Sequence, residues 1–144
     1  MIDQLINALV ESRNEAADDT LLEALRVGNE VEQSMAMGAL LRRKTVHGLS
    51  GIITAYESLS QQLQLQVLAS AGHLHHALRE CGRSELSERR VAALRLIAVS
   101  RQGRLSHVVA ENLHESDEQV SKTACEALTA LARWIATETK RLQK

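Results

Sequence analysis

The feature that most constrains the fold is the absence of Pro and Phe from all 144 residues, together with a single Trp and a single Tyr. Strands favour aromatic and β-branched side chains, whereas Ala, Leu, Glu, Gln and Arg, which are plentiful here, are good helix formers. We therefore expect an all-α protein with a core of Leu, Ile, Val, Ala and Met. A chain of this length buries about 70% of its unfolded surface, so we expect one domain over residues 1–144.

Apolar side chains recur at helical spacing along the whole chain. The stripe between residues 62 and 80 runs through Gly72 without a change of phase, so we expect one helix there. Short connections would place neighbouring helices antiparallel. We therefore favour stacked helical hairpins in an α-solenoid over an ordinary helical bundle. The spacing predicts about eight helices, at 2–12, 19–27, 30–43, 46–58, 62–80, 85–101, 104–114 and 118–141.

Local signals mark where these helices begin and end. Gly28 is expected in the left-handed conformation that ends many helices, and Gly103 is expected to end the helix at 85–101. Val31 and Ile135 belong to apolar stripes and are expected to face the core, whereas Trp134 would be either a cap on the last core layer or an exposed anchor. We expect N-caps at Asp18 or Asp19, at Ser60, and at Ser116 or Asp117.

Residues 104–136 resemble a HEAT repeat. This segment has an apolar helix ending in Leu113, a short acidic turn "ESDEQ", and a second helix that opens with Val120 and continues with Ala124 and Leu128. Residues 87–98 and 20–43 resemble parts of two further units. The chain lacks the Pro common in HEAT turns, and its units are not spaced at the usual period of about 40 residues. We therefore expect a short, irregular HEAT-like array.

The resemblance implies a protein–protein interaction or scaffold module without catalytic activity. The alternative it implies is a HEAT-like nucleic-acid-binding or base-excision module, similar to a DNA glycosylase, because HEAT-like folds also host enzymes. No nucleophile elbow, P-loop or dinucleotide-binding glycine motif occurs, so we expect no catalytic residue and no cofactor.

Basic side chains gather around the helix expected at 85–101. The net charge is −6 over residues 1–32, from eight acids and two bases, and +6 over residues 33–110, from ten bases and four acids. The ordinary interpretation is a salt-bridged surface. As a binding surface it would suit an acidic protein first and nucleic acid second, and the asymmetry also allows self-association. The candidate interaction residues are Arg79, Arg83, Arg89, Arg90, Arg95, Arg101 and Arg104.

Other polar groups suggest less. His73, His76 and Glu80 would share a helix face, but two imidazoles and one carboxylate leave a zinc ion short of ligands, so we expect no metal.

Cys125 is expected to be buried and Cys81 accessible, and two reduced thiols fit a cytoplasmic protein. The start of the chain lacks the basic region of a signal peptide. No apolar run approaches the ~20 residues of a membrane span, so we expect no membrane partner.

Overall fold

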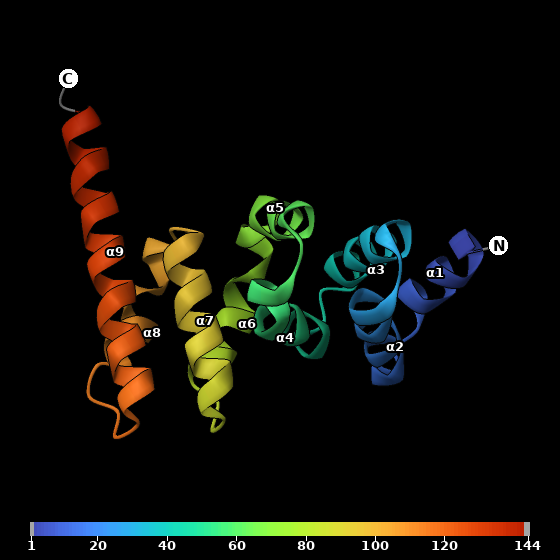
Figure 1. The fold of residues 1–144 in the computed structure, drawn as a ribbon, viewed down its shortest axis with the longest axis horizontal. Coiled ribbons are helices and arrows are strands. Elements are labelled where there is room, and N and C mark those ends of the chain that lie inside the picture. Colours follow the sequence, from blue (N-terminus) through green and yellow to red (C-terminus); the bar gives the residue numbers. More distant parts are fainter. Residues whose placement is uncertain (1, 143–144) are drawn as a thin grey trace. The chain divides into compact units, whose positions relative to one another are not determined.

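The computed structural model describes residues 2–142, and within that range it confirms the all-α prediction, with nine α-helices, three short 3-10 helices and no strand (Figure 1). We expected about eight helices. The α-helices are α1 (Ile2–Glu11), α2 (Glu15–Val27), α3 (Glu30–Arg43), α4 (Val46–Ala55), α5 (Gln61–Ala69), α6 (His75–Gly82), α7 (Ser87–Val99), α8 (Ser106–Glu111) and α9 (Glu118–Leu142); the 3-10 helices are η1 (Tyr56–Ser58), η2 (Ala71–Leu74) and η3 (Gly103–Leu105).

The extra helix arises where we expected one continuous helix at 62–80. That prediction is wrong, because α5 ends at Ala69 and η2 precedes α6. Around Ser70 the backbone bonds tighten to the 3-10 pattern, with the Ser70 N–H donating to the Val67 carbonyl at 3.0 Å and the His73 N–H to the Ser70 carbonyl at 2.9 Å. Gly72 lies inside this turn and, with its low helix propensity, weakens the α-helical alternative.

The chain divides into two compact units after Ala77, within α6. In the first unit, α2 packs on α3 and α4, and α1 packs on α3; in the second, α7 and α8 both pack on α9. Both cores are aliphatic, as expected. Their largest fully buried side chains include Leu21, Met37, Leu40, Ile52 and Ile53 in the first unit and Leu94, Leu96, Ile97, Leu105 and Leu131 in the second.

Side-chain caps set most helix starts. Ser60 and Asp117 are confirmed as caps: the Ser60 hydroxyl accepts from the Leu63 N–H at 3.4 Å, and Asp117 Oδ1 accepts from the Gln119 N–H at 2.9 Å. The expected cap at Asp18 or Asp19 is wrong, because α2 begins one turn earlier and Asn14 caps it.

Asp18 instead forms a buried ion pair with Arg43. Arg43 Nε lies 2.6 Å from Asp18 Oδ1, and their side chains are 2% and 0% exposed. The same guanidinium donates to the Leu9 carbonyl and, at 2.5 Å, to the Ser12 carbonyl, where α1 ends. Asp18 Oδ2 accepts from the Thr45 hydroxyl at 2.9 Å. One charge pair therefore holds the end of α1, the start of α2 and the end of α3 together.

Gly28 and Gly103 do not act as helix ends in the way we expected. Gly28 has φ −72° and ψ 167°, so it is extended rather than left-handed. A glycine is required there for steric reasons, because a Cβ would lie 2.5 Å from the Ala24 carbonyl oxygen and 2.9 Å from Glu32 Cβ. After α7, the left-handed residue is Arg101, with φ 56°, two positions before Gly103.

The two cysteines also reverse our expectations: Cys81 is buried and Cys125 is exposed. On α9 the buried positions include Val120, Ala124 and Leu131, and Cys125 lies beside that stripe rather than on it. Among residues 2–142, no helix is long and apolar enough to cross a membrane.

Candidate interaction surface

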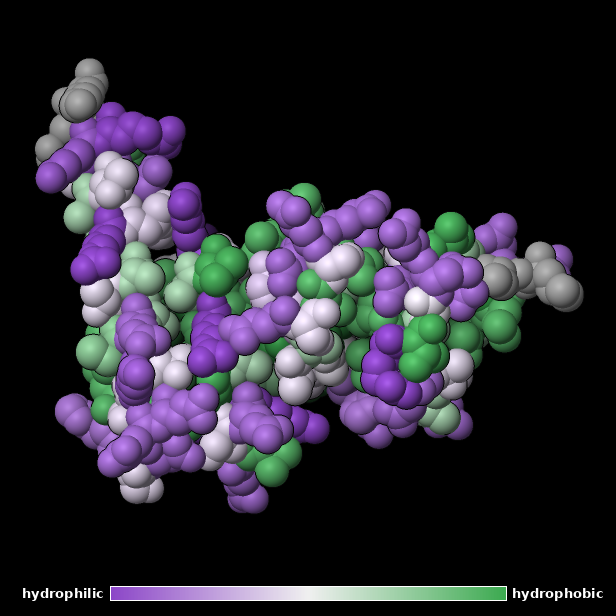
Figure 2. Space-filling model, in the orientation of Figure 1, coloured by the Kyte–Doolittle hydropathy of each residue, from purple (hydrophilic) through white to green (hydrophobic). Residues whose placement is uncertain are grey.

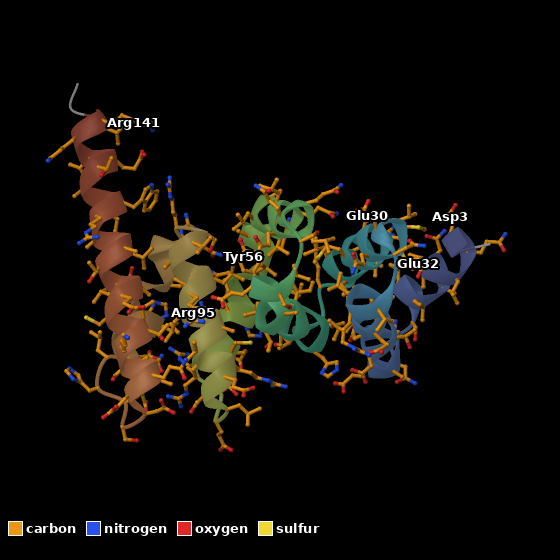
Figure 3. All side chains as sticks on the ribbon, viewed as in Figure 1. Asp3, Glu30, Glu32, Tyr56, Arg95 and Arg141 are labelled. Carbon is orange, nitrogen blue, oxygen red and sulfur yellow. The ribbon has the colours of Figure 1, made fainter. Side chains whose placement is uncertain are left out.

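All seven arginines of the predicted Arg-rich zone belong to the second unit, but the structure does not gather them on one face. Arg79 is half-buried on α6, and Arg83 follows that helix. Arg89 and Arg95 are both exposed on α7, six residues apart, so they point in different directions around the helix. Figure 3 marks Arg95, which shares its side of α7 with Glu88 and Val99.

Arg83 and Arg90 hold the end of α8. Arg83 makes a two-pronged pair with Glu111, Nη2 to Oε1 at 2.8 Å and Nε to Oε2 at 3.0 Å. That hydrogen bond lowers the pKa of the Glu111 carboxyl from its ordinary value. Arg90 pairs with Glu115 at 2.8 Å and donates to the buried Asn112 Oδ1 at 3.2 Å. These two arginines therefore serve the internal structure of the unit.

Asn112 completes this arrangement from the inside. Its side-chain amide donates to the Gly82 carbonyl at 3.0 Å and to the Val108 carbonyl at 2.8 Å. Because a buried polar group left without partners is costly, this network holds the end of α8 against the end of α6. Asn112 was not identified from the sequence, although its partner Arg90 was among the candidate residues.

Arg101 and Arg104 lie elsewhere, beside an apolar surface at the far end of α7. The backbone turns sharply after Val99: the Gln102 N–H donates to the Ile97 carbonyl at 3.1 Å, with Arg101 left-handed between them. This is the hydrogen bond of a Schellman turn, in which a Gly usually occupies the left-handed position. An Arg there costs about 1 kcal/mol relative to Gly. The turn presents Arg101 and Arg104 on either side of Gly103.

The turn at Gly103 lies close to α9. A Cβ added at Gly103 would lie at van der Waals distance from two side chains of α9, 3.9 Å from Trp134 Cζ3 and 4.0 Å from Ile135 Cδ1. Ile135 is 47% exposed and Val99 is 54% exposed, while Trp134 is half-buried. We call Gly103, Trp134 and Ile135 the α7–α9 patch. The expectation that Ile135 faces the core is wrong, because the buried stripe of α9 ends at Leu131.

Exposed arginines lie close in sequence to the α7–α9 patch. Arg101 and Arg104 flank Gly103 in the turn, Arg133 precedes Trp134 on α9, and all three are exposed. Within residues 2–142, no acidic side chain forms an ion pair with any of the three. The acidic residue on the same side of α9 as Trp134 and Ile135 is Glu138, which pairs with Arg141 at 2.9 Å. Figure 2 shows hydrophobic surface at the end of α7 with hydrophilic side chains beside it. Trp and Arg are two of the residue types enriched in binding hot spots.

The histidine-rich stretch does not form a site. His73 lies in η2 and His76 in α6, so the helix face that they were expected to share is interrupted. In the part of the chain that the structure describes, no three His, Cys, Asp or Glu side chains come together as ligands for a metal ion.

Comparison with known proteins gave no relative. No family model matches the chain, and no curated protein or solved structure is significantly similar to it. Function is therefore inferred from the α7–α9 patch.

Proposed function

We propose that this protein is a HEAT-like interaction module whose α7–α9 patch binds an acidic, amphipathic segment of another protein. The observation that carries the proposal is the closeness of the Gly103 turn to Trp134 and Ile135, which places these side chains near Arg101 and Arg104. Within residues 2–142, neither arginine forms an ion pair. Apolar anchors supply affinity, and the surrounding charges select and steer the partner.

The arrangement of helices supports the repeat-like part of this proposal. The main contacts join helices one or two places apart in the chain, such as α2 with α3 and α4, and α7 with α9. Contacts restricted to near neighbours are typical of solenoid repeats. Solenoid proteins commonly use a helix-lined surface to bind other proteins.

Arg101 gives a second line of support. It occupies a left-handed backbone position, φ 56°, where Gly would be more stable. Lys44 has the same left-handed conformation at the end of α3, so backbone strain alone does not mark a functional residue. What distinguishes Arg101 is its position in the turn beside Gly103 and the α7–α9 patch, and on that ground we assign its side chain a role in binding.

The test is a titration of a fluorescein-labelled helical peptide of about four turns, with Leu on one face and Glu on both flanks. A peptide of the same composition in scrambled order is the control ligand. We expect the ordered peptide to bind, with an affinity that falls as salt rises from about 50 to 500 mM. Ile135→Glu should weaken binding at least tenfold, since it puts a like charge in the centre of the surface.

Arg101→Gly separates binding from folding. It should stabilise the protein by about 1 kcal/mol, because the left-handed strain is relieved, and yet weaken peptide binding. Lys44→Gly is the matched control: Lys44 has φ 55° at the end of α3, so the same change should stabilise equally and leave binding unchanged. Equal affinity of wild type, Ile135→Glu and Arg101→Gly would refute the proposal. Preferential binding of a DNA or RNA oligonucleotide through the same residues would replace it with a nucleic-acid function.

A further inference from the structure

A second apolar surface with the opposite charge lies in the first unit, at the turn between α2 and α3. Val27, the last residue of α2, is 61% exposed, and Val31, in the first turn of α3, is 66% exposed. The prediction that Val31 faces the core is therefore wrong. Between them lie only the two turn residues and the first residue of α3, so both valines belong to the same end of this helix pair.

The turn that carries these valines is tightly held. The Gly28 N–H donates to the Ala24 carbonyl at 2.8 Å, and Gly28 has no space for a side chain. The Asn29 side chain accepts from the Glu32 N–H at 2.9 Å and donates to Glu32 Oε1 at 2.8 Å. A surface fixed in this way loses little conformational entropy when it binds a partner.

Acidic residues are close neighbours of the two valines in the sequence. Glu23 precedes Val27 by one helical turn, and Glu30 and Glu32 flank Val31, with Arg26 as the basic exception, paired to Glu23 at 2.5 Å. Figure 3 marks Glu30 and Glu32 at the start of α3. We call Val27, Val31, Glu23, Glu30 and Glu32 the α2–α3 turn surface. It is an apolar centre with an acidic rim, the complement of the α7–α9 patch with its basic rim.

We propose that the α2–α3 turn surface of one copy of this chain docks on the α7–α9 patch of a second copy. The inference rests on the proposed binding role of the α7–α9 patch and names a second copy as its partner. Both surfaces are exposed in the same chain, and each presents the charge that the other attracts. Because two different surfaces meet, the contact is heterologous, so an open chain of copies keeps one surface of each kind free at its ends, whereas a closed ring keeps none.

Each surface has only a few anchoring side chains, so the association should be weak and concentration-dependent. Sedimentation velocity of the full chain, from about 5 to 500 μM, measures it. The monomer mass is 15.9 kDa. We expect the average mass to rise continuously beyond the dimer near 50 mM salt and to return towards the monomer near 500 mM, because salt screens the charged rims.

Two variants test the geometry. Val31→Lys disables the α2–α3 turn surface and Ile135→Glu disables the α7–α9 patch, so each alone should remain monomeric, with association weakened at least tenfold. Mixed together, they retain one intact surface each and should form a heterodimer and nothing larger. Leu65→Glu and Leu86→Glu, at side chains 60% and 57% exposed outside both surfaces, are the controls and should associate like the wild type.

A monomeric wild type at the highest concentration and low salt would overturn the inference, as would a mixture of the two variants that stays monomeric. The peptide titration distinguishes this failure from failure of the proposed function. If the acidic peptide binds the wild type but not Ile135→Glu while the protein remains monomeric, then the docking role stands and only the second copy is refuted.

Discussion

Replacing Asp18 by Ala should be among the most destabilising single changes in the first unit. Asp18 is fully buried, its Oδ1 lies 2.6 Å from Arg43 Nε, and its Oδ2 accepts from the Thr45 hydroxyl at 2.9 Å. The change leaves the Arg43 guanidinium, only 2% exposed, without its counter-charge. Carbonyl oxygens at the end of α1 still accept from Arg43, but they carry only partial charge.

The magnitude follows from this burial. Removing one partner of a buried ion pair costs about 3–5 kcal/mol, because an uncompensated charge stays inside. A whole domain is stable by only about 5–15 kcal/mol, so the variant should lose a large part of its stability. Arg43→Met should be similarly damaging. It strands Asp18 and also leaves the Leu9 and Ser12 carbonyls without their donor.

Chemical denaturation followed by circular dichroism gives the free energies of unfolding for wild type, both single variants and the double variant. The double variant removes both charges, so it should cost about 3 kcal/mol less than the sum of the singles. Tyr56 lies in the first unit and Trp134 in the second. Fluorescence of these residues reports which unit has been destabilised.

Asp19→Ala is the matched control. Asp19 neighbours Asp18 but is exposed, and its pair with His47 is a surface contact, so the loss should be within about 1 kcal/mol. A cost for Asp18→Ala no greater than that of Asp19→Ala would refute the reasoning. Strictly additive single variants would do so as well, since they would show that Asp18 and Arg43 do not depend on each other.

Two further predictions concern glycines and pH. Gly38→Ala should raise the free energy of unfolding by about 0.5–1 kcal/mol, since Gly38 lies inside α3 and a new Cβ would meet open space there. Gly82→Ala should lower the free energy of unfolding by about 1–3 kcal/mol, because its Cβ would lie 2.4 Å from Val108 Cγ1. Equal effects of the two changes in chemical denaturation would contradict both predictions. The hydrogen bond to Asp19 raises the pKa of His47 above its ordinary 6.5. The pair therefore stabilises the fold fully below pH 6.5, and this stabilisation is lost as the pH rises through the raised pKa. His47→Gln should therefore cost about 0.5 kcal/mol near pH 5.5 and nothing near pH 8.5, and a penalty that grows with pH would disprove the assignment.

The helices themselves were largely predictable, because apolar spacing and capping residues are local properties of the sequence. Ser60 and Asp117 cap where expected, and α3 spans the predicted residues 30–43. The aliphatic core followed from the near absence of aromatic side chains. Gly72 was misjudged, because an unbroken stripe reports the average face of a segment and not the hydrogen-bonding pattern at one turn.

The sequence contains a signal from which half of the buried ion pair could have been predicted. Asp18, Leu21 and Leu25 are spaced i, i+3 and i+7, so the carboxylate lies on the apolar face of α2 and needs a cation. Which cation supplies it could not be predicted, since Arg43 is 25 residues away and its position depends on how α3 packs. The seven arginines were grouped because they are close in the sequence, but residues close in sequence need not share a face. Arg89 and Arg95, six residues apart, already lie on different sides of α7.

The candidate surfaces were mispredicted for a single physical reason. Val31 and Ile135 continue apolar stripes, but each lies where its helix is no longer covered by a neighbour. Periodicity identifies a face of a helix and carries no information on how far the covering helices extend. That extent depends on tertiary packing, which is why both exposed surfaces emerged only from the structure.

The length of α9 has a consequence for its dynamics. Its 25 residues span about 37 Å, whereas the 13 residues of α7 span about 20 Å. From residue 132 to residue 142 only Trp134 and Glu138 are half-buried, and the rest are exposed. Amide hydrogen exchange should therefore quicken along one continuous helix, from slow between the buried Ala124 and Leu131 to fast beyond Ile135. A ligand bound at Ile135 would slow amide exchange in those outer turns. Ligand binding and the folding of the last turns of α9 are therefore thermodynamically linked.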